Sequence, residues 1–156
     1  MDEKLIVSSS PHILDDDTTQ RIMLDVVIAL LPATVAAIYY FKTNAAILIL
    51  LSVLTAVISE AVFQKIMKQP LTINDLSAVV TGILLAFNIP STAPWWIPVF
   101  GAGFAIIVVK QCFGGLGQNF MNPSLAVRCF LLISFAGTMS PLSVHGVTGP
   151  TPLAEL

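Results

Sequence analysis

A polar loop at positions 110–124 has the composition of a ligand-binding segment. It interrupts an otherwise apolar sequence with two asparagines, Asn119 and Asn122, and with three glycines, Gly114, Gly115 and Gly117. Glycine lets the main chain approach a flat ligand closely. The amides of Asn119 and Asn122 can hold a ring with mixed donors and acceptors, such as an isoalloxazine. The simpler alternative is that both asparagines cap a helix that begins near Pro123.

A second loop, Thr148-Gly-Pro-Thr-Pro152, suggests a different chemistry. Because Gly and Pro dominate turns, the segment can be read as an ordinary turn. The more specific interpretation uses the hydroxyl of Thr151 as the attachment point of a phosphorylated cofactor. A threonine on an exposed turn can be reached by a modifying enzyme, whereas one inside a helix cannot.

Glu60 is the ionisable residue that most suggests a function inside a membrane. It closes an apolar run, and a carboxylate near membrane depth is a functional candidate by default. The alternative is a solvated helix end beside Lys65 and Lys68.

The remaining ionisable and thiol side chains have plainer interpretations. Asp25 and Asp75 stand at predicted helix starts, where they would act as caps, and Asn74 is an alternative cap for the second of these helices. Arg128 is expected to extend to the inner surface of a membrane. The two cysteines, Cys112 and Cys129, are expected to be small buried hydrophobic residues.

Composition places the chain in a membrane. Of its 156 residues, 56% are hydrophobic and only 10% are charged, whereas about a quarter are charged in soluble domains. The formal net charge is -2, so no basic surface is present that could bind nucleic acid. The sequence predicts an all-α integral membrane protein.

About five transmembrane helices are expected. The apolar stretches are Ile22–Phe41, Ala45–Phe63, Leu76–Ile89, Trp95–Val109 and Leu125–Thr138. A spanning helix needs about 20 residues, so the last three must extend beyond their apolar cores, and a broken or re-entrant element is the alternative for Leu76–Ile89. A tight turn is expected at Thr43 and Asn44. Trp95 and Trp96 are expected to anchor the chain at the membrane interface.

Positive charge predicts the orientation. With a cytoplasmic N-terminus, only Lys42 lies outside, and the inner side receives Lys4, Arg21, Lys65, Lys68, Lys110 and Arg128. Residues 1–21 then form a cytoplasmic segment, 22–139 a five-helix membrane domain, and 140–156 a loop outside the cytoplasmic membrane that contains Thr148 and Thr151. The glycine–asparagine loop falls on the inner side. The chain is expected to be the front part of a larger protein.

Several motifs together resemble RnfD, the D component of the Rnf complex. They are Ser10-Pro-His-Ile13, Ile22-Met-Leu-Asp-Val26 with Ala29-Leu-Leu-Pro-Ala33, Asp75-Leu-Ser-Ala-Val-Val-Thr-Gly82, and the loop Phe113–Pro123. The resemblance implies one five-helix repeat of a fold similar to that of urea transporters, which contain two such repeats. It also implies electron transfer between ferredoxin and NAD+, coupled to translocation of Na+ or H+. The implied partners are the other Rnf subunits.

The same resemblance assigns cofactors to particular residues. It implies FMN joined through its phosphate to Thr151 by a flavin transferase outside the cytoplasm, within a pattern that Thr148 and Gly149 also match. His145 and Pro150 depart from that pattern, which usually has an acid and an alanine there. Similarity to a quinone-reducing relative implies non-covalent riboflavin at Asn119 and Asn122. It also implies sodium uptake at Glu60.

Two other functions compete with that of an electron-carrying subunit. No strand-turn-helix glycine fingerprint and no cysteine cluster occurs, so this chain would not be a complete oxidoreductase. A small-solute channel or transporter is favoured by the implied fold and by the Asn-Pro-Ser sequence of the inner loop. A purely structural subunit is the third hypothesis. Covalent flavin fluorescence separates the first hypothesis from both others.

Overall fold

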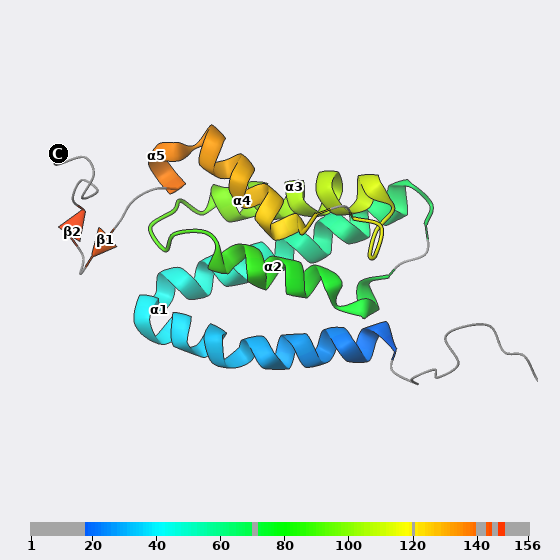
Figure 1. Ribbon diagram of the computed structural model, residues 1–156, viewed down its shortest axis with the longest axis horizontal. Coiled ribbons are helices and arrows are strands. Elements are labelled where there is room, and N and C mark those ends of the chain that lie inside the picture. The colour runs from blue at the N-terminus through cyan, green and yellow to red at the C-terminus, as the bar shows by residue number, and fades with distance from the viewer. Residues whose placement is uncertain (1–17, 70–71, 120, 140–142, 145–146, 149–156) are drawn as a thin grey trace, which may run out of the picture.

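The computed structural model describes residues 18–69, 72–119, 121–139, 143–144 and 147–148, and within these ranges the chain is almost entirely helical. The elements are α1 (Thr19–Ile66), η1 (Ile73–Asp75), α2 (Ser77–Phe87), α3 (Trp96–Phe104), η2 (Ala105–Lys110), η3 (Gln111–Phe113), α4 (Pro123–Ser134), α5 (Ala136–Met139), β1 (Ser143–Val144) and β2 (Val147–Thr148). The helices run back and forth between two ends of the molecule (Figure 1).

Helix α1 consists of two segments joined at Lys42. This residue has φ 53° and ψ −138°, which interrupts the helix and turns the chain back (Figure 1). The break comes one residue before the expected turn at Thr43 and Asn44. The helix begins at Thr19, where the Thr18 hydroxyl accepts a hydrogen bond from the Arg21 amide at 3.3 Å. Asp25 therefore lies inside the helix, and the expectation that it caps the helix was wrong.

The start of α2 is held by Asp75, as expected. Asp75 Oδ1 accepts hydrogen bonds from the Ser77 amide at 2.9 Å and from Ser77 Oγ at 2.6 Å. Further along, α2 packs closely against the second half of α1 at Gly82. A Cβ atom at Gly82 would lie 2.7 Å from Val53 Cα, and Ser52 Oγ donates to the Gly82 carbonyl at 2.8 Å. Only glycine allows the two main chains to approach this closely.

The structure confirms five helical segments but gives them unequal lengths. The halves of α1 supply two, and α2, the continuous stretch Trp96–Phe113, and α4 supply one each. Both α1 and Trp96–Phe113 are long and apolar enough to cross a membrane. The 11 residues of α2 and the 12 of α4 extend only about 16–18 Å at 1.5 Å per residue. A hydrocarbon core is about 30 Å thick, so length favours the broken or re-entrant alternative for α2.

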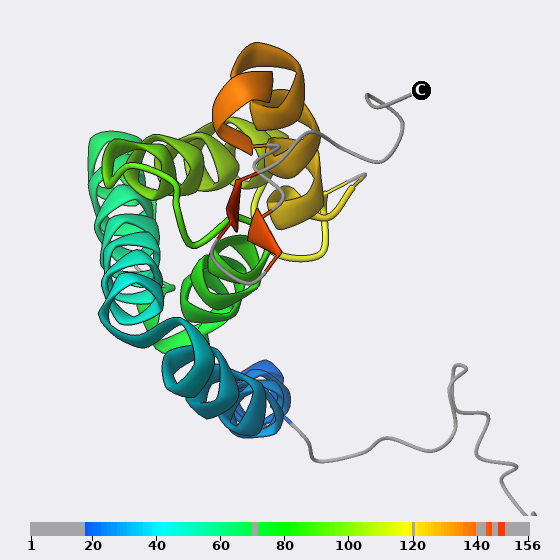
Figure 2. The same cartoon turned by 90° about the vertical axis from the view of Figure 1, so that its left-hand side faces the viewer.

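The core lies between the second half of α1 and the helices α2, α3 and α4. Small residues such as Ala56, Ala78 and Ala102 bring the helices together there, and an aromatic stack of Phe104 on Phe130, with centroids 4.6 Å apart, joins α3 to α4. In the first half of α1 no residue before Ala45 is buried. That segment lies at the edge of the bundle (Figure 2), where its apolar side chains are available to lipid or to another chain.

Cys112 and Cys129 are both exposed, so the expectation that they are buried was wrong. Apolar character predicts burial in a soluble core, but in a membrane it is equally compatible with a helix face toward lipid.

Candidate functional site

An ion pair between Glu60 and Lys110 lies in the interior of the helical bundle. Lys110 Nζ is 2.6 Å from Glu60 Oε1, and only 2% of the lysine side chain and 1% of the glutamate side chain are exposed. Glu60 belongs to α1, whereas Lys110 ends η2. The alternative of a solvated glutamate at a helix end is therefore wrong. Each charge removes most of the cost of burying the other, because an isolated charge at this depth is expensive.

Three donors converge on one oxygen of Glu60. Besides Lys110, Gln111 Nε2 donates to Oε1 at 2.9 Å and Gln64 Nε2 approaches it at 3.4 Å. Lys110 Nζ also donates to Ser77 Oγ at 2.6 Å. The second carboxylate oxygen, Oε2, is buried without a hydrogen-bond partner. A buried carboxylate oxygen with no partner is uncommon, because it loses its hydration without replacement.

The backbone of η2 explains how two consecutive side chains reach the same carboxylate. Ala105–Lys110 is a π-helical segment, in which hydrogen bonds join residues five apart and the turn is wider than in an α-helix. Lys110 at its end and Gln111 just after it both turn toward α1 and contact Glu60. Such π segments occur frequently at functional sites.

The polar network continues from Glu60 to the surface. Lys110 is bonded to Ser77, whose hydroxyl donates to Asp75 Oδ1 at 2.6 Å. Asp75 is only half buried and, with Thr72 and Asn74, lines a surface cleft of about 420 Å³. A second branch runs through Gln64, whose amide donates to Thr72 Oγ1 at 2.6 Å. A continuous series of polar groups therefore connects the buried pair to one end of the bundle.

The glycine–asparagine loop follows directly after Lys110. Gly114, Gly115 and Gly117 all have positive φ, at 103°, 91° and 84°, which only glycine adopts without strain. The amides of the first two end the helix by donating to the main-chain oxygens of Gln111 and Lys110, each at 3.1 Å. The glycines are thus required by the turn itself, whatever the loop binds.

The two asparagines of this loop have different structural positions. Asn122 caps α4, since its Oδ1 accepts from the Ser124 amide at 3.0 Å. With its amide oriented to suit its neighbours, Asn119 instead donates to the carbonyls of Lys110 at 3.1 Å and Gly115 at 3.0 Å. Helix capping is confirmed for Asn122 and is wrong for Asn119, which closes the loop. Flavin binding by either residue stays a prediction.

The second candidate loop is described only in part. Strands β1 and β2 pair antiparallel, with Ser143 opposite Thr148. Gly149 and Thr151 lie outside the described residues, as do His145 and Pro150. Attachment of a cofactor at Thr151 therefore stays a prediction.

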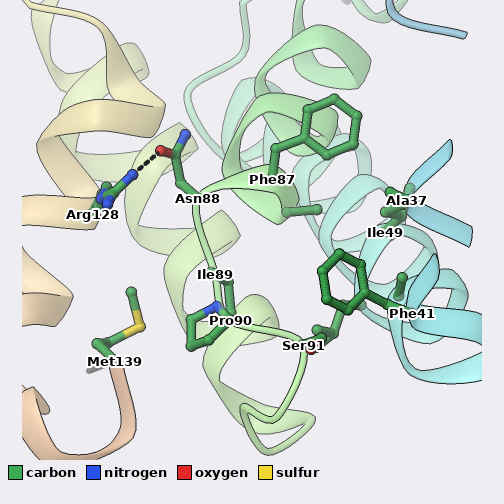
Figure 3. A pocket seen from close by; sticks show the side chains of 13 residues that line it. Ala37, Phe41, Ile49, Phe87, Asn88, Ile89, Pro90, Ser91, Arg128 and Met139 are labelled. Carbon is green, nitrogen blue, oxygen red and sulfur yellow. Dashed lines mark hydrogen bonds between the residues drawn. The ribbon is translucent and has the colours of Figure 1, made fainter. Parts of the chain in front are cut away.

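Arg128 lines a cavity of about 490 Å³ between α1, α4 and the end of α2. Its Nη1 donates to Asn88 Oδ1 at 2.7 Å (Figure 3). Asn88 follows α2 at the end opposite to Asp75, so Arg128 extends away from the surface on which the charge count placed it. The expectation that it extends to the inner surface was wrong, because α4 begins beside the middle of α2, where Ser124 Oγ donates to the Thr81 carbonyl.

The positions of Lys110 and Arg128 weaken the charge bias. Lys110 is buried in an ion pair. Among the described residues, Arg21, Lys65 and Lys68 remain at one end of the bundle, and Lys42 lies at the other (Figure 1). The predicted orientation keeps its direction, with fewer charges behind it.

The sequence pattern indicates Glu60 but not its partner. The charge count places Lys110 at the inner surface beside a loop, and no pattern singles out Ser77, Gln64 or Gln111. One signal is present in the sequence, because Lys110 directly follows an apolar stretch long enough to place it at membrane depth. An ionisable residue there requires a partner.

Comparison with known proteins places this chain in a described group. A family model described as the NQR2, RnfD, RnfE family matches residues 6–156. The D component of the Na(+)-translocating ferredoxin:NAD(+) oxidoreductase complex of Acetobacterium woodii is 57% identical over 97% of this chain and 49% of its own length. The D components of the ion-translocating oxidoreductase complexes of Shewanella piezotolerans and Salmonella newport are 41% and 43% identical, over 94% of this chain and 43% and 42% of their own lengths. The chain thus spans about half the length of these curated relatives.

Proposed function

Because this chain belongs to the NQR2, RnfD, RnfE family, we propose that it is an electron-carrying membrane part of an Rnf-type complex. In that complex, electrons pass between ferredoxin and NAD+, and the transfer drives Na+ or H+ across the cytoplasmic membrane. The chain works together with the other subunits, because it has neither a nicotinamide-binding fingerprint nor a cysteine cluster of its own.

One observation carries the ion-translocating part of this proposal. Glu60 is completely buried in the helical bundle, and its Oε2 has no hydrogen-bond partner. A carboxylate inside a membrane domain marks an ion or proton pathway by default. The polar series from Asp75 supplies a connection between that carboxylate and the surface.

The electron-carrying part of the proposal depends on flavins. FMN would be joined through its phosphate to Thr151 by a flavin transferase, and riboflavin would lie at the glycine–asparagine loop. The loop fits a flat ring, because an added Cβ at Gly117 would meet no atom within 4 Å and the main chain there is open to approach. A flavin supplies electron transfer, while this chain's residues set its position and the charge around it.

Purified complex that contains this chain tests both parts. Denatured, gel-resolved chain should fluoresce under ultraviolet light, and Thr151→Val should lose that fluorescence while the protein still inserts. Glu60→Gln should lower ion pumping more than flavin content. A wild-type chain without covalent flavin would favour a solute channel or a structural subunit instead. Unchanged pumping by Glu60→Gln would remove Glu60 from the ion pathway.

A further inference from the structure

The hydrogen-bonded groups around Glu60 carry an unbalanced formal charge. Glu60 and Asp75 are carboxylates, and Lys110 is the single ammonium between them, bonded directly to Glu60 and through Ser77 Oγ to Asp75. Two negative charges and one positive charge leave one negative charge. Charges in a low-dielectric interior interact strongly, so the series has electrostatic capacity for one additional monovalent cation.

The oxygen atoms at the inner end suit an alkali cation. Glu60 Oε2 is buried without a partner. Glu60 Oε1 and Ser77 Oγ are each 2.6 Å from Lys110 Nζ. Carboxylate and hydroxyl oxygens are the ligands that hard cations prefer. The Lys110 ammonium therefore stands where a metal cation of the same charge would be bound.

Asp75 supplies a second position for the displaced ammonium. Its Oδ1 already accepts the Ser77 hydroxyl to which Lys110 is bonded, so the ammonium has an unbroken series of oxygen atoms to follow. Asp75 is half buried and lines the surface cleft, where a charge is better solvated than beside Glu60. Moving the ammonium outward separates it from a cation bound at Glu60 and reduces their repulsion.

We propose that Lys110 is a tethered cation that competes with an alkali cation for Glu60, and that Asp75 receives the Lys110 ammonium when the alkali cation binds. The inference rests on the proposed ion-translocating function and adds the residues that make the exchange possible. Lys110 keeps Glu60 neutralised when no ion is bound, and its return from Asp75 expels the ion. No covalent bond changes in this exchange.

The Na+ dependence of the reconstituted complex tests the exchange. Electron-transfer turnover and uptake of radioactive sodium are measured against Na+ concentration in liposomes that contain the wild type or a variant. Lys110→Gln removes the competitor, so the Na+ concentration for half-maximal turnover should fall by about tenfold, equivalent to about 1.4 kcal/mol, and maximal turnover should fall because release is slow. Lys110→Arg keeps the charge and should stay close to the wild-type half-saturating concentration.

Asp75→Asn provides the opposite prediction and a variant that should still fold. Asn Oδ1 can accept the same two bonds from Ser77, so the start of α2 is preserved, but the additional negative charge is lost. The half-saturating Na+ concentration should therefore rise by about tenfold. If Lys110→Gln does not assemble, as judged from flavin content, this variant decides the question alone.

The outcomes separate the exchange from the proposed function. Half-saturating Na+ concentrations that do not move in opposite directions in Lys110→Gln and Asp75→Asn overturn the exchange, even if both variants are less stable. A wild-type complex that pumps protons without any dependence on Na+ also overturns the exchange and leaves the proposed function standing. A wild-type complex that moves no cation overturns the proposed function itself.

Discussion

At the scale of single residues, local contacts could be predicted from the sequence and distant ones could not. Asp75 was expected to cap α2, and it does so through Ser77, two residues away. Glu60 is recognisable as unusual because a carboxylate in an apolar run is costly. Its partner Lys110 is 50 residues away in sequence, and no local pattern joins two residues at that separation. The buried pair is therefore a result of the packing of α1 against η2.

The buried pair predicts unequal effects of single and double substitutions. In Na+-free buffer, Lys110→Met should destabilise the protein by about 3–5 kcal/mol, because it leaves Glu60 buried without its counter-charge. The double variant Glu60→Gln/Lys110→Met should recover most of that loss. Thermal unfolding of the purified complex in detergent measures both. Equal loss in the single and the double variant would show that Glu60 is not charged in the resting state.

At the scale of helices, apolar runs predict the number of segments better than their limits. The run Ile22–Phe41 begins three residues after the true start of α1, because Thr18 caps a polar first turn that no apolar pattern shows. Periodicity also gives no indication that Ala105–Lys110 is π-helical, since that conformation depends on contacts with neighbouring helices. The approach of α2 to α1 at Gly82 is equally hidden, because a glycine in a helix does not reveal which surface it faces.

Helix packing at Gly82 predicts a marked difference between two glycine substitutions. Gly82→Ala should force α1 and α2 apart, because its Cβ would lie 2.7 Å from Val53 Cα, and such overpacking costs about 1–3 kcal/mol. Gly103→Ala is the matched control, since its Cβ would meet only Ser59 Oγ at 3.7 Å. Melting temperatures of the two variants in detergent measure the difference. A Gly82→Ala protein as stable as Gly103→Ala would refute the close contact.

At the scale of the whole molecule, the helical passages leave the start of α1 and the end of α5 at opposite ends of the bundle (Figure 1). The end with Arg21, Lys65 and Lys68 also contains the cleft beside Asp75. Ions would therefore approach Glu60 from the side that the positive-inside rule assigns to the cytoplasm. The unburied first half of α1 is the face on which lipid or another chain would pack.

The orientation of the bundle can be tested with two engineered cysteines in a background that carries Cys112→Ala and Cys129→Ala. Both native cysteines are exposed, so the background should fold. Thr43→Cys, beside the break in α1, should react with a membrane-impermeant maleimide in intact cells, because a cytoplasmic N-terminus places that turn outside. Asn74→Cys, beside the cleft, should react only after the membrane is permeabilised. The reverse pattern would put the Asp75 cleft outside and Thr151 inside, out of reach of an extracytoplasmic flavin transferase. Labelling of both cysteines from one side would show that the second half of α1 does not cross the membrane.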